Sequence, residues 1–164
     1  MVNNPLILIS ACLMGQAVRY DGDSKLANHP ILFNWSKLGL LIPVCPEVEG
    51  GLPIPRCPAE ISSRSNGTIS VINTDNQDVT NQFDNGADYA LRLCVDKSIK
   101  MAILTESSPS CGSSNIYDGS FSSIKIDGEG VTTKLLRRNN IKVFSEHQLD
   151  EALNFHDELK ITRE

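Results

Sequence analysis

The sequence lacks dense basic patches and long apolar runs, and only 5% of its residues are aromatic. Its formal net charge is −5, and the tightest basic cluster, Lys134 with Arg137 and Arg138, has the spacing of a solvated helix face. Because nucleic-acid binding depends on clustered Lys and Arg, we expect no nucleic-acid partner. The first apolar run, residues 6–9, is too short for a signal peptide or a membrane span. We therefore expect a cytoplasmic protein with no membrane partner.

Paired cysteines are also missing. The five cysteines lie at irregular spacing, and no two of them form a Cys-x-x-Cys motif. In a reducing compartment such thiols serve metal binding or catalysis more often than disulfides. Cys94 is expected to differ, because it lies on the apolar stripe of a predicted helix and would pack as a small hydrophobic residue.

Four short, mostly apolar runs alternate with helical patterns along the chain. The expected strands are residues 6–9, 40–44, 101–104 and 141–144, and the expected helices are residues 29–37, 80–98, 131–138 and a last helix from 145. This alternation predicts an α/β fold with a mostly parallel, Rossmann-like sheet and helices on both faces. Thr80 and Ser145 are expected to cap the second and the last helix. At 164 residues, 40% of them hydrophobic, we expect residues 1–164 to form one domain.

Glycine, proline and aspartate mark the expected loops. Residues 48–64 are rich in Gly and Pro and are predicted to form one long structured loop. Asn66-Gly67, followed by alternating apolar residues up to Thr74, predicts a small β-hairpin excursion with its turn at Asp75-Asn76. Residues 115–130 hold five Gly or Asp turn residues and are predicted to be a loop with one short strand.

Three cysteines lie in the segments that follow three of the predicted strands. Cys12 follows the first strand, Cys45 the second and Cys111 the third, within the small-residue stretch 107–112. Because the carboxyl ends of parallel strands meet at one edge of a sheet, we expect these three thiols to converge there.

The chemistry of three dispersed thiols is limited. A zinc site would normally need a fourth protein ligand and local pairing, which the sequence does not show. An iron–sulfur cluster accepts dispersed thiolates, and three of them leave one iron without a protein ligand. Such an iron can act as a Lewis acid on a soft atom, so the pattern favours a catalytic site.

Two polar residues accompany these cysteines. Glu47 lies two residues after Cys45 and is a candidate proton carrier, although it could equally be an exposed loop acid. Ser108 lies three residues before Cys111 and could orient a water or a substrate, or only satisfy backbone groups.

Taken together, these motifs resemble a small bacterial family typified by 2-thiouracil desulfidase. The resemblance covers residues 6–146 and rests on Ser10-Ala11-Cys12-Leu13-Met14-Gly15, Arg19-Tyr20-Asp21-Gly22, Pro43-Val44-Cys45-Pro46-Glu47, Gly50-Gly51-Leu52-Pro53, Pro55-Arg56, Ser108-Pro109-Ser110-Cys111-Gly112 and Tyr117-Asp118-Gly119. It implies a 4Fe-4S cluster held by Cys12, Cys45 and Cys111, with the fourth iron open to the sulfur of a thiolated base. It also implies that Glu47 is the catalytic acid/base and Ser108 its partner.

Two positions depart from the family pattern. A lysine or similar residue is expected where Thr105 stands, and a proline where Cys57 stands. Thr105 therefore bears on substrate detail, and Cys57 is a spare thiol that could compete as a ligand.

The function expected from these motifs is non-redox desulfuration of a thiolated pyrimidine, such as 2-thiouracil, to the oxo base and hydrosulfide. Glu47 would activate water and Ser108 would help to hold it, while Arg19, Asp21 and Arg56 are candidates to bind the polar edge of the base. Each of these three could instead be an ordinary loop salt-bridge residue.

Two other functions stay open at this point. Cys111 could be a nucleophile that takes sulfur as a persulfide without a metal. The chain could also be a metal-binding module without turnover. The sequence leaves the physiological substrate and the oligomeric state open.

Overall fold

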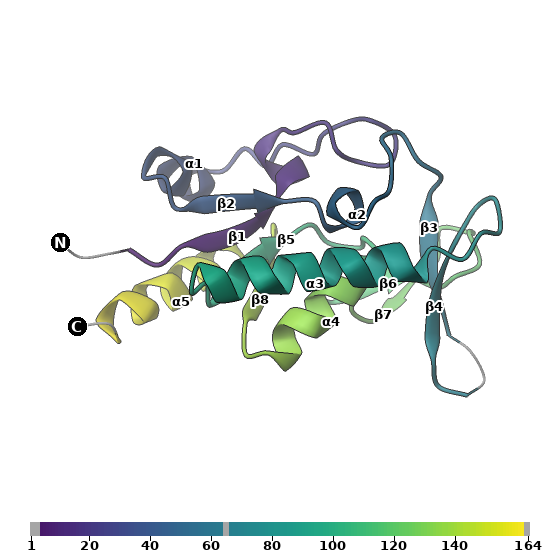
Figure 1. Ribbon diagram of the computed structural model, residues 1–164. Helices are drawn as coiled ribbons and strands as arrows, with labels where there is room; N and C mark the ends of the chain where they lie inside the picture. Colours follow the sequence, from purple (N-terminus) through teal and green to yellow (C-terminus); the bar gives the residue numbers. More distant parts are fainter. Residues whose placement is uncertain (1–3, 64–65, 163–164) are drawn as a thin grey trace.

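A four-stranded parallel sheet forms the centre of the computed structural model, which describes residues 4–63 and 66–162 (Figure 1). Its strand order is β2-β1-β5-β8, with β1 at Ile7–Ser10, β2 at Leu41–Val44, β5 at Met101–Leu104 and β8 at Lys142–Ser145. β1 and β5 are buried along their whole length, because central strands of a parallel sheet are covered on both faces. Pro43, which has no N–H to donate, lies on the edge strand β2.

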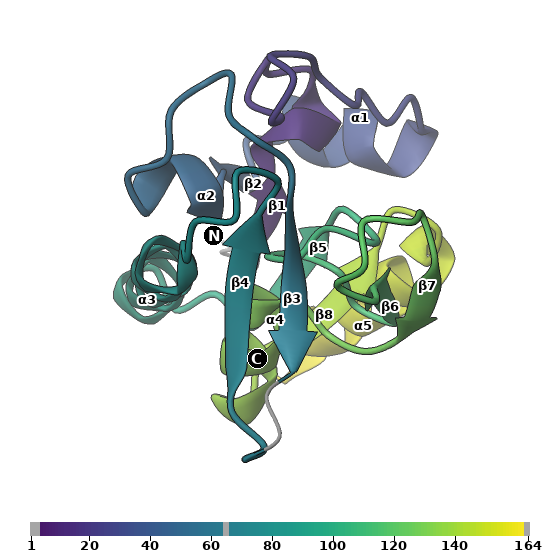
Figure 2. The ribbon, with the colours of Figure 1, turned by 90° about the vertical axis from the view of Figure 1, so that its right-hand side faces the viewer.

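Helices cover both faces of this sheet, as predicted. On one face, α1 (Pro30–Lys37) and α5 (Leu149–Ile161) contribute Trp35 and Ala152 to a core cluster with Ile7 and Ile9. On the other face, α3 (Thr80–Asp96) and α4 (Val131–Arg138) pack against Leu8 and the rest of a second cluster. Figure 2 shows α3 and α1 on opposite sides of β1. The predicted α/β fold is confirmed.

Two antiparallel ribbons leave the central sheet. β3 (Ala59–Ser63) pairs with β4 (Ile69–Asn73), and β6 (Asn115–Tyr117) pairs with β7 (Lys125–Asp127). The β3-β4 ribbon lies at the right-hand end of the molecule in Figure 1, where Ile61 and Val71 pack with Phe83 of α3. None of the helices within residues 4–63 and 66–162 combines the length and the apolar character needed to cross a membrane.

Several sequence predictions need correction. The predicted loop 48–64 contains β3, because its prolines end at Pro58 and the following residues are free to pair. Arg64, at the end of that loop, lies outside the described residues. The hairpin therefore lies between β3 and β4, and the turn at Asp75-Asn76 leads only to a single bridge, between Ile72 and Asp78. Residues 115–130 contain two short strands, β6 and β7, where one was predicted.

The predicted helix caps are also wrong. Thr80 is the first residue of α3, and its backbone N–H donates to the Asp78 carboxylate at 3.0 Å. Ser145 ends β8, and α5 begins only at Leu149. Both errors concern the exact residue at which a helix begins. A Ser or Thr near that point can be the cap, can lie before it or can lie in the first turn, and the neighbouring residues do not distinguish these positions.

Candidate active site

Three cysteines lie together beyond the carboxyl edge of the sheet. Cys12 is in the short 3-10 helix η1 (Ala11–Met14) that follows β1, and Cys45 directly precedes α2 (Pro46–Glu49) after β2. Cys111 lies in the loop after β5. Because β2, β1 and β5 are neighbours and parallel, their ends meet, and each of the three thiols interacts electrostatically with the other two.

Burial dominates the chemistry of these thiols. Cys12 and Cys111 are only 6% and 4% exposed. Burial, together with the neighbouring Cys45, raises the pKa of Cys12 to about 11. Burial likewise raises the pKa of Cys45 and, more strongly, that of Cys111. Without a metal the three groups are therefore neutral thiols, and a metal centre would bind them as thiolates with release of protons.

The placement of the thiols bears on which kind of metal centre fits them. Among the described residues, no three His, Cys, Asp or Glu side chains are close enough together to hold one metal ion. In an iron–sulfur cluster each cysteine binds a different iron, so the thiols need not meet at one point. Three mutually interacting thiols in a desolvated corner fit a cluster better than a zinc ion.

Glu47 connects the Cys45 segment with the Cys111 loop. Its Oε2 accepts a hydrogen bond and ion pair from Arg56 Nε at 2.7 Å, and both side chains are largely buried. Its Oε1 lies 3.5 Å from Ser108 Oγ, which is long for an O–H···O bond. Glu47 also interacts electrostatically with Cys45 and with Cys111. The predicted acid/base residue therefore lies beside the thiols.

Ser108 has two sets of contacts. Its Oγ accepts the backbone N–H groups of Ser110 and Cys111, both at 3.2 Å. Because the oxygen already accepts two hydrogen bonds, the hydroxyl hydrogen is free to be directed at Glu47. Ser108 thus satisfies the backbone of the loop and faces the carboxylate at the same time.

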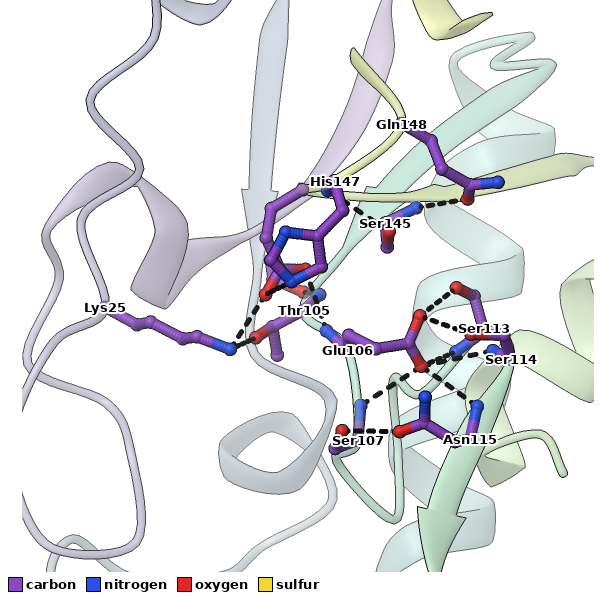
Figure 3. Close-up of polar contacts among 12 residues, drawn as sticks. Lys25, Thr105, Glu106, Ser107, Ser113, Ser114, Asn115, Ser145, His147 and Gln148 are labelled. Carbon is purple, nitrogen blue, oxygen red and sulfur yellow. Dashed lines mark hydrogen bonds and ion pairs between the residues drawn. The ribbon is translucent and has the colours of Figure 1, made fainter. Parts of the chain in front are cut away.

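A half-buried carboxylate that sequence reasoning missed organises the Cys111 loop (Figure 3). Glu106 Oε1 accepts backbone N–H groups from Ser107, Ser113, Ser114 and Asn115 at 2.8–3.2 Å. Its Oε2 accepts the hydroxyls of Ser113 and Ser114 at 2.6 and 3.1 Å. Burial opposes ionisation, but these hydrogen bonds outweigh it and lower the pKa of Glu106 to about 2.

An ammonium group also lies close to the Cys12 and Cys111 loops. Lys25 Nζ donates to Thr105 Oγ1 at 3.0 Å and pairs with Glu146 Oε1 at 2.8 Å (Figure 3). The second Glu146 oxygen accepts the backbone N–H of Glu106 at 2.8 Å. The lysine expected at position 105 is absent, but Lys25 brings its ammonium group to the Thr105 side chain from another segment. The backbone N–H of Lys25 donates to the Cys12 carbonyl at 2.9 Å.

Ser10 is a further residue that sequence reasoning did not single out. The residue is 2% exposed, and its hydroxyl accepts the backbone N–H of Thr105 at 2.9 Å. It also hydrogen-bonds the Cys111 thiol, which partly offsets the effect of burial on the pKa of Cys111. Its position before Cys12 at the end of a predicted buried strand was the available signal.

The remaining sequence candidates lie in different surroundings. Arg19 is half-buried, interacts electrostatically with Cys12 and stacks on Tyr20 at 5.8 Å. Asp21 is exposed and accepts the backbone N–H of Asp23 in its own turn.

The two remaining cysteines lie in different surroundings. Cys57, named above as a competing ligand, contacts Asp75 at 3.1 Å. Cys94 lies on α3 and is 1% exposed within the second core cluster, as predicted for a packing residue.

A family model described as 2-thiouracil desulfurase matches residues 7–148, which include all three strand-end cysteines, Glu47 and Ser108. The chain belongs to this family. The match spans the central sheet and ends just before α5, so the family pattern coincides with the elements that position the thiols.

Two relatives of this desulfurase family member cover almost its whole length. The uncharacterized protein YbbK of Bacillus subtilis (strain 168) is 39% identical over 155 residues, which is 90% of this chain and 100% of YbbK. A solved structure of the 4Fe-4S-dependent thiouracil desulfidase TudS is 49% identical, with a TM-score of 0.86, and the match covers 92% of this chain and 97% of TudS.

Proposed function

We propose that this protein is a 4Fe-4S-dependent desulfidase that converts 2-thiouracil, or a closely related thiolated pyrimidine, into the oxo base and hydrosulfide. The observation that carries this proposal is the convergence of three mutually interacting thiols, two of them buried and that of Cys45 half-buried, beside Glu47 and Ser108. Membership of the 2-thiouracil desulfurase family and the likeness to TudS, at 49% identity, support it. The proposed setting is the cytoplasm, where free thiols persist.

Cys12, Cys45 and Cys111 are the proposed cluster ligands. Their burial leaves them in a corner of low water content, and their mutual interaction means that a cationic centre would relieve the repulsion between thiolates. When bound, a cluster with three protein ligands supplies an open iron that acts as a Lewis acid on the thiocarbonyl sulfur.

Glu47 and Ser108 are proposed to handle the water and its protons. Their facing oxygens lie 3.5 Å apart, so one water molecule placed beside the pair can contact both of them. Glu47 takes a proton from this water as the water oxygen bonds to the thiocarbonyl carbon. The C–S bond then breaks, and the proton returns to the departing sulfur, so that base and water become oxo base and hydrogen sulfide or its anion. No electron donor is needed.

The persulfide alternative is disfavoured by the surroundings of Cys111. A sulfur-accepting nucleophile reacts as a thiolate and needs access to its substrate. Cys111 is 4% exposed, and its burial raises its pKa far above the physiological range. A binding module without turnover would in turn give no reason for Glu47 and Ser108 to face each other beside the thiols.

The test is anaerobic purification followed by iron and sulfide analysis, a visible spectrum and a hydrosulfide assay with 2-thiouracil. We expect a brown protein that releases hydrosulfide. Cys12→Ala, Cys45→Ala and Cys111→Ala should each lose both the cluster and turnover. A colourless wild-type protein that still desulfurates would refute the cluster, and a brown protein that never releases hydrosulfide would refute the enzyme.

Two cysteine variants serve as matched controls. Cys94→Ala removes a thiol of α3 that belongs to the same core cluster as Cys111 and whose pKa is raised by burial alone. Cys57→Ser removes the half-buried thiol paired with Asp75. Both should keep the cluster and turnover. Loss of iron in Cys57→Ser alone would show that Cys57 replaces one of the three proposed ligands.

A further inference from the structure

The Arg56 side chain is buried and committed to protein oxygens. It is 7% exposed, although it follows directly on a stretch of exposed residues, Pro53–Pro55. Its Nε donates to Glu47 Oε2 at 2.7 Å, its Nη1 to the Pro53 carbonyl at 3.2 Å and its Nη2 to the Val18 carbonyl at 3.0 Å. Three of its five N–H groups are thus engaged, one on each nitrogen, and the burial of the side chain leaves the other two little access to a substrate.

The contact with Arg56 makes the two Glu47 oxygens unequal. Oε2 is held by the guanidinium, whereas Oε1 faces the Ser108 hydroxyl. A carboxylate held at one oxygen cannot rotate freely, so the other oxygen keeps a single direction. In this structure that direction is toward the loop that carries Cys111.

Arg56 also ties Glu47 to the segment that follows Cys12. Its backbone N–H donates to the Tyr20 carbonyl at 2.8 Å, beside the side-chain bond to Val18. The same Val18 carbonyl lies 3.8 Å from Cys45 Sγ. One residue thus connects the segments after two of the three strand-end cysteines with the carboxylate that faces the third.

We propose that Arg56 is a positioning residue, which acts on the reaction through Glu47 and does not bind the substrate. The assignment rests on the proposed function. Its physical basis is the fork of the guanidinium, which holds Glu47 and the Val18 carbonyl at once, whereas a lysine ammonium is a single point charge. Arg56 orients the general base and thereby contributes to turnover.

The test compares Arg56→Lys with wild type and with Arg138→Lys, which changes an exposed arginine on α4. Anaerobic holoenzyme is assayed for hydrosulfide release across a range of 2-thiouracil concentrations, and kcat is expressed per cluster from iron content. We expect kcat of Arg56→Lys to fall roughly 10- to 100-fold with KM changed less than about 3-fold, because misplacement of the base affects the transition state and not the ground state. Iron content and visible spectrum should match wild type, and Arg138→Lys should be unchanged.

Distinct results would overturn the assignment. A large rise in KM with kcat retained would make Arg56 a substrate ligand, and a loss of iron with normal kcat per cluster would leave it only a structural role. If lysine is not accommodated, Arg56→Gln, which keeps a donor toward Glu47 without the charge, is expected to show the same division between kcat and KM. Absence of hydrosulfide release by the wild-type protein would refute the proposed function itself, and this assignment with it.

Discussion

The carboxylate of Glu106 offers a sharp test of how the Cys111 loop is held. Its two oxygens have separate roles, because Oε1 accepts only backbone N–H groups and Oε2 accepts only serine hydroxyls. Glu106→Gln therefore removes the charge but keeps the geometry: the amide oxygen can replace Oε1, and the amide nitrogen can donate to hydroxyls that rotate to accept.

The expected cost follows from the pKa of this group. A fall from 4.5 to about 2 corresponds to at most about 3 kcal/mol of folding stability, which partial solvent exposure reduces to about 2 kcal/mol. Because the folded-state pKa is depressed, this contribution is present above about pH 4.5 and is lost as the pH falls toward about 2. Glu106→Gln should therefore be less stable than wild type at neutral pH by about 2 kcal/mol and should converge with it in acid.

Denaturant unfolding of Glu106→Gln and wild type, repeated from neutral pH down to about pH 3, measures this convergence. The acid series is run on cluster-free protein, so that loss of a cluster at low pH does not contribute. The exposed Glu158 on α5 supplies the control, because Glu158→Gln should leave the curve unchanged. A stability difference for Glu106→Gln that is absent at neutral pH, or that does not shrink in acid, would refute the reasoning.

Three further predictions concern the neighbouring elements. Glu47→Gln should lower kcat for hydrosulfide release by roughly 100-fold or more, whereas Glu49→Gln, an exposed change on the same helix, should leave it unchanged; equal losses would contradict the role of Glu47. Gly86→Ala should destabilise the fold by about 2–4 kcal/mol in thermal unfolding, because the new methyl group would lie 1.9 Å from the Pro46 carbonyl oxygen; a neutral result would mean that α2 can move away from α3. Ser10→Ala should cost about 1–2 kcal/mol by denaturant unfolding, because it leaves a part-buried backbone N–H without its acceptor; unchanged stability would argue that water replaces the hydroxyl.

The central sheet was predictable because three of its four strands are short, mostly aliphatic runs, and the fourth, β8, continues the alternation of strands with helices. In β1, Ile7 and Ile9 face one core cluster and Leu8 faces the other, so the strand is apolar on both faces and composition alone marks it. The convergence of the strand-end cysteines follows from the same parallel arrangement. β3 was missed because the prolines before it dominate the pattern of its segment, although Ala59–Ser63 itself contains none.

The network around the Cys111 loop was not predictable by the same reasoning. Lys25 and Glu146 are separated by 121 positions, and no local spacing indicates that they pair. Glu106 is surrounded by serines that look like ordinary loop residues until the loop closes around the carboxylate. Arg56 appeared suited to bind a substrate, because sequence shows its charge but not that protein oxygens surround all of its nitrogens.

The central claim is a non-redox desulfuration carried out by the three thiols together with Glu47 and Ser108. Anaerobic turnover of 2-thiouracil in water labelled with oxygen-18 tests this claim most directly. Without added reductant, the account predicts uracil that carries the label, formed together with an equal amount of hydrosulfide. A requirement for an electron donor, unlabelled uracil, or sulfur retained on the protein as a persulfide would contradict it.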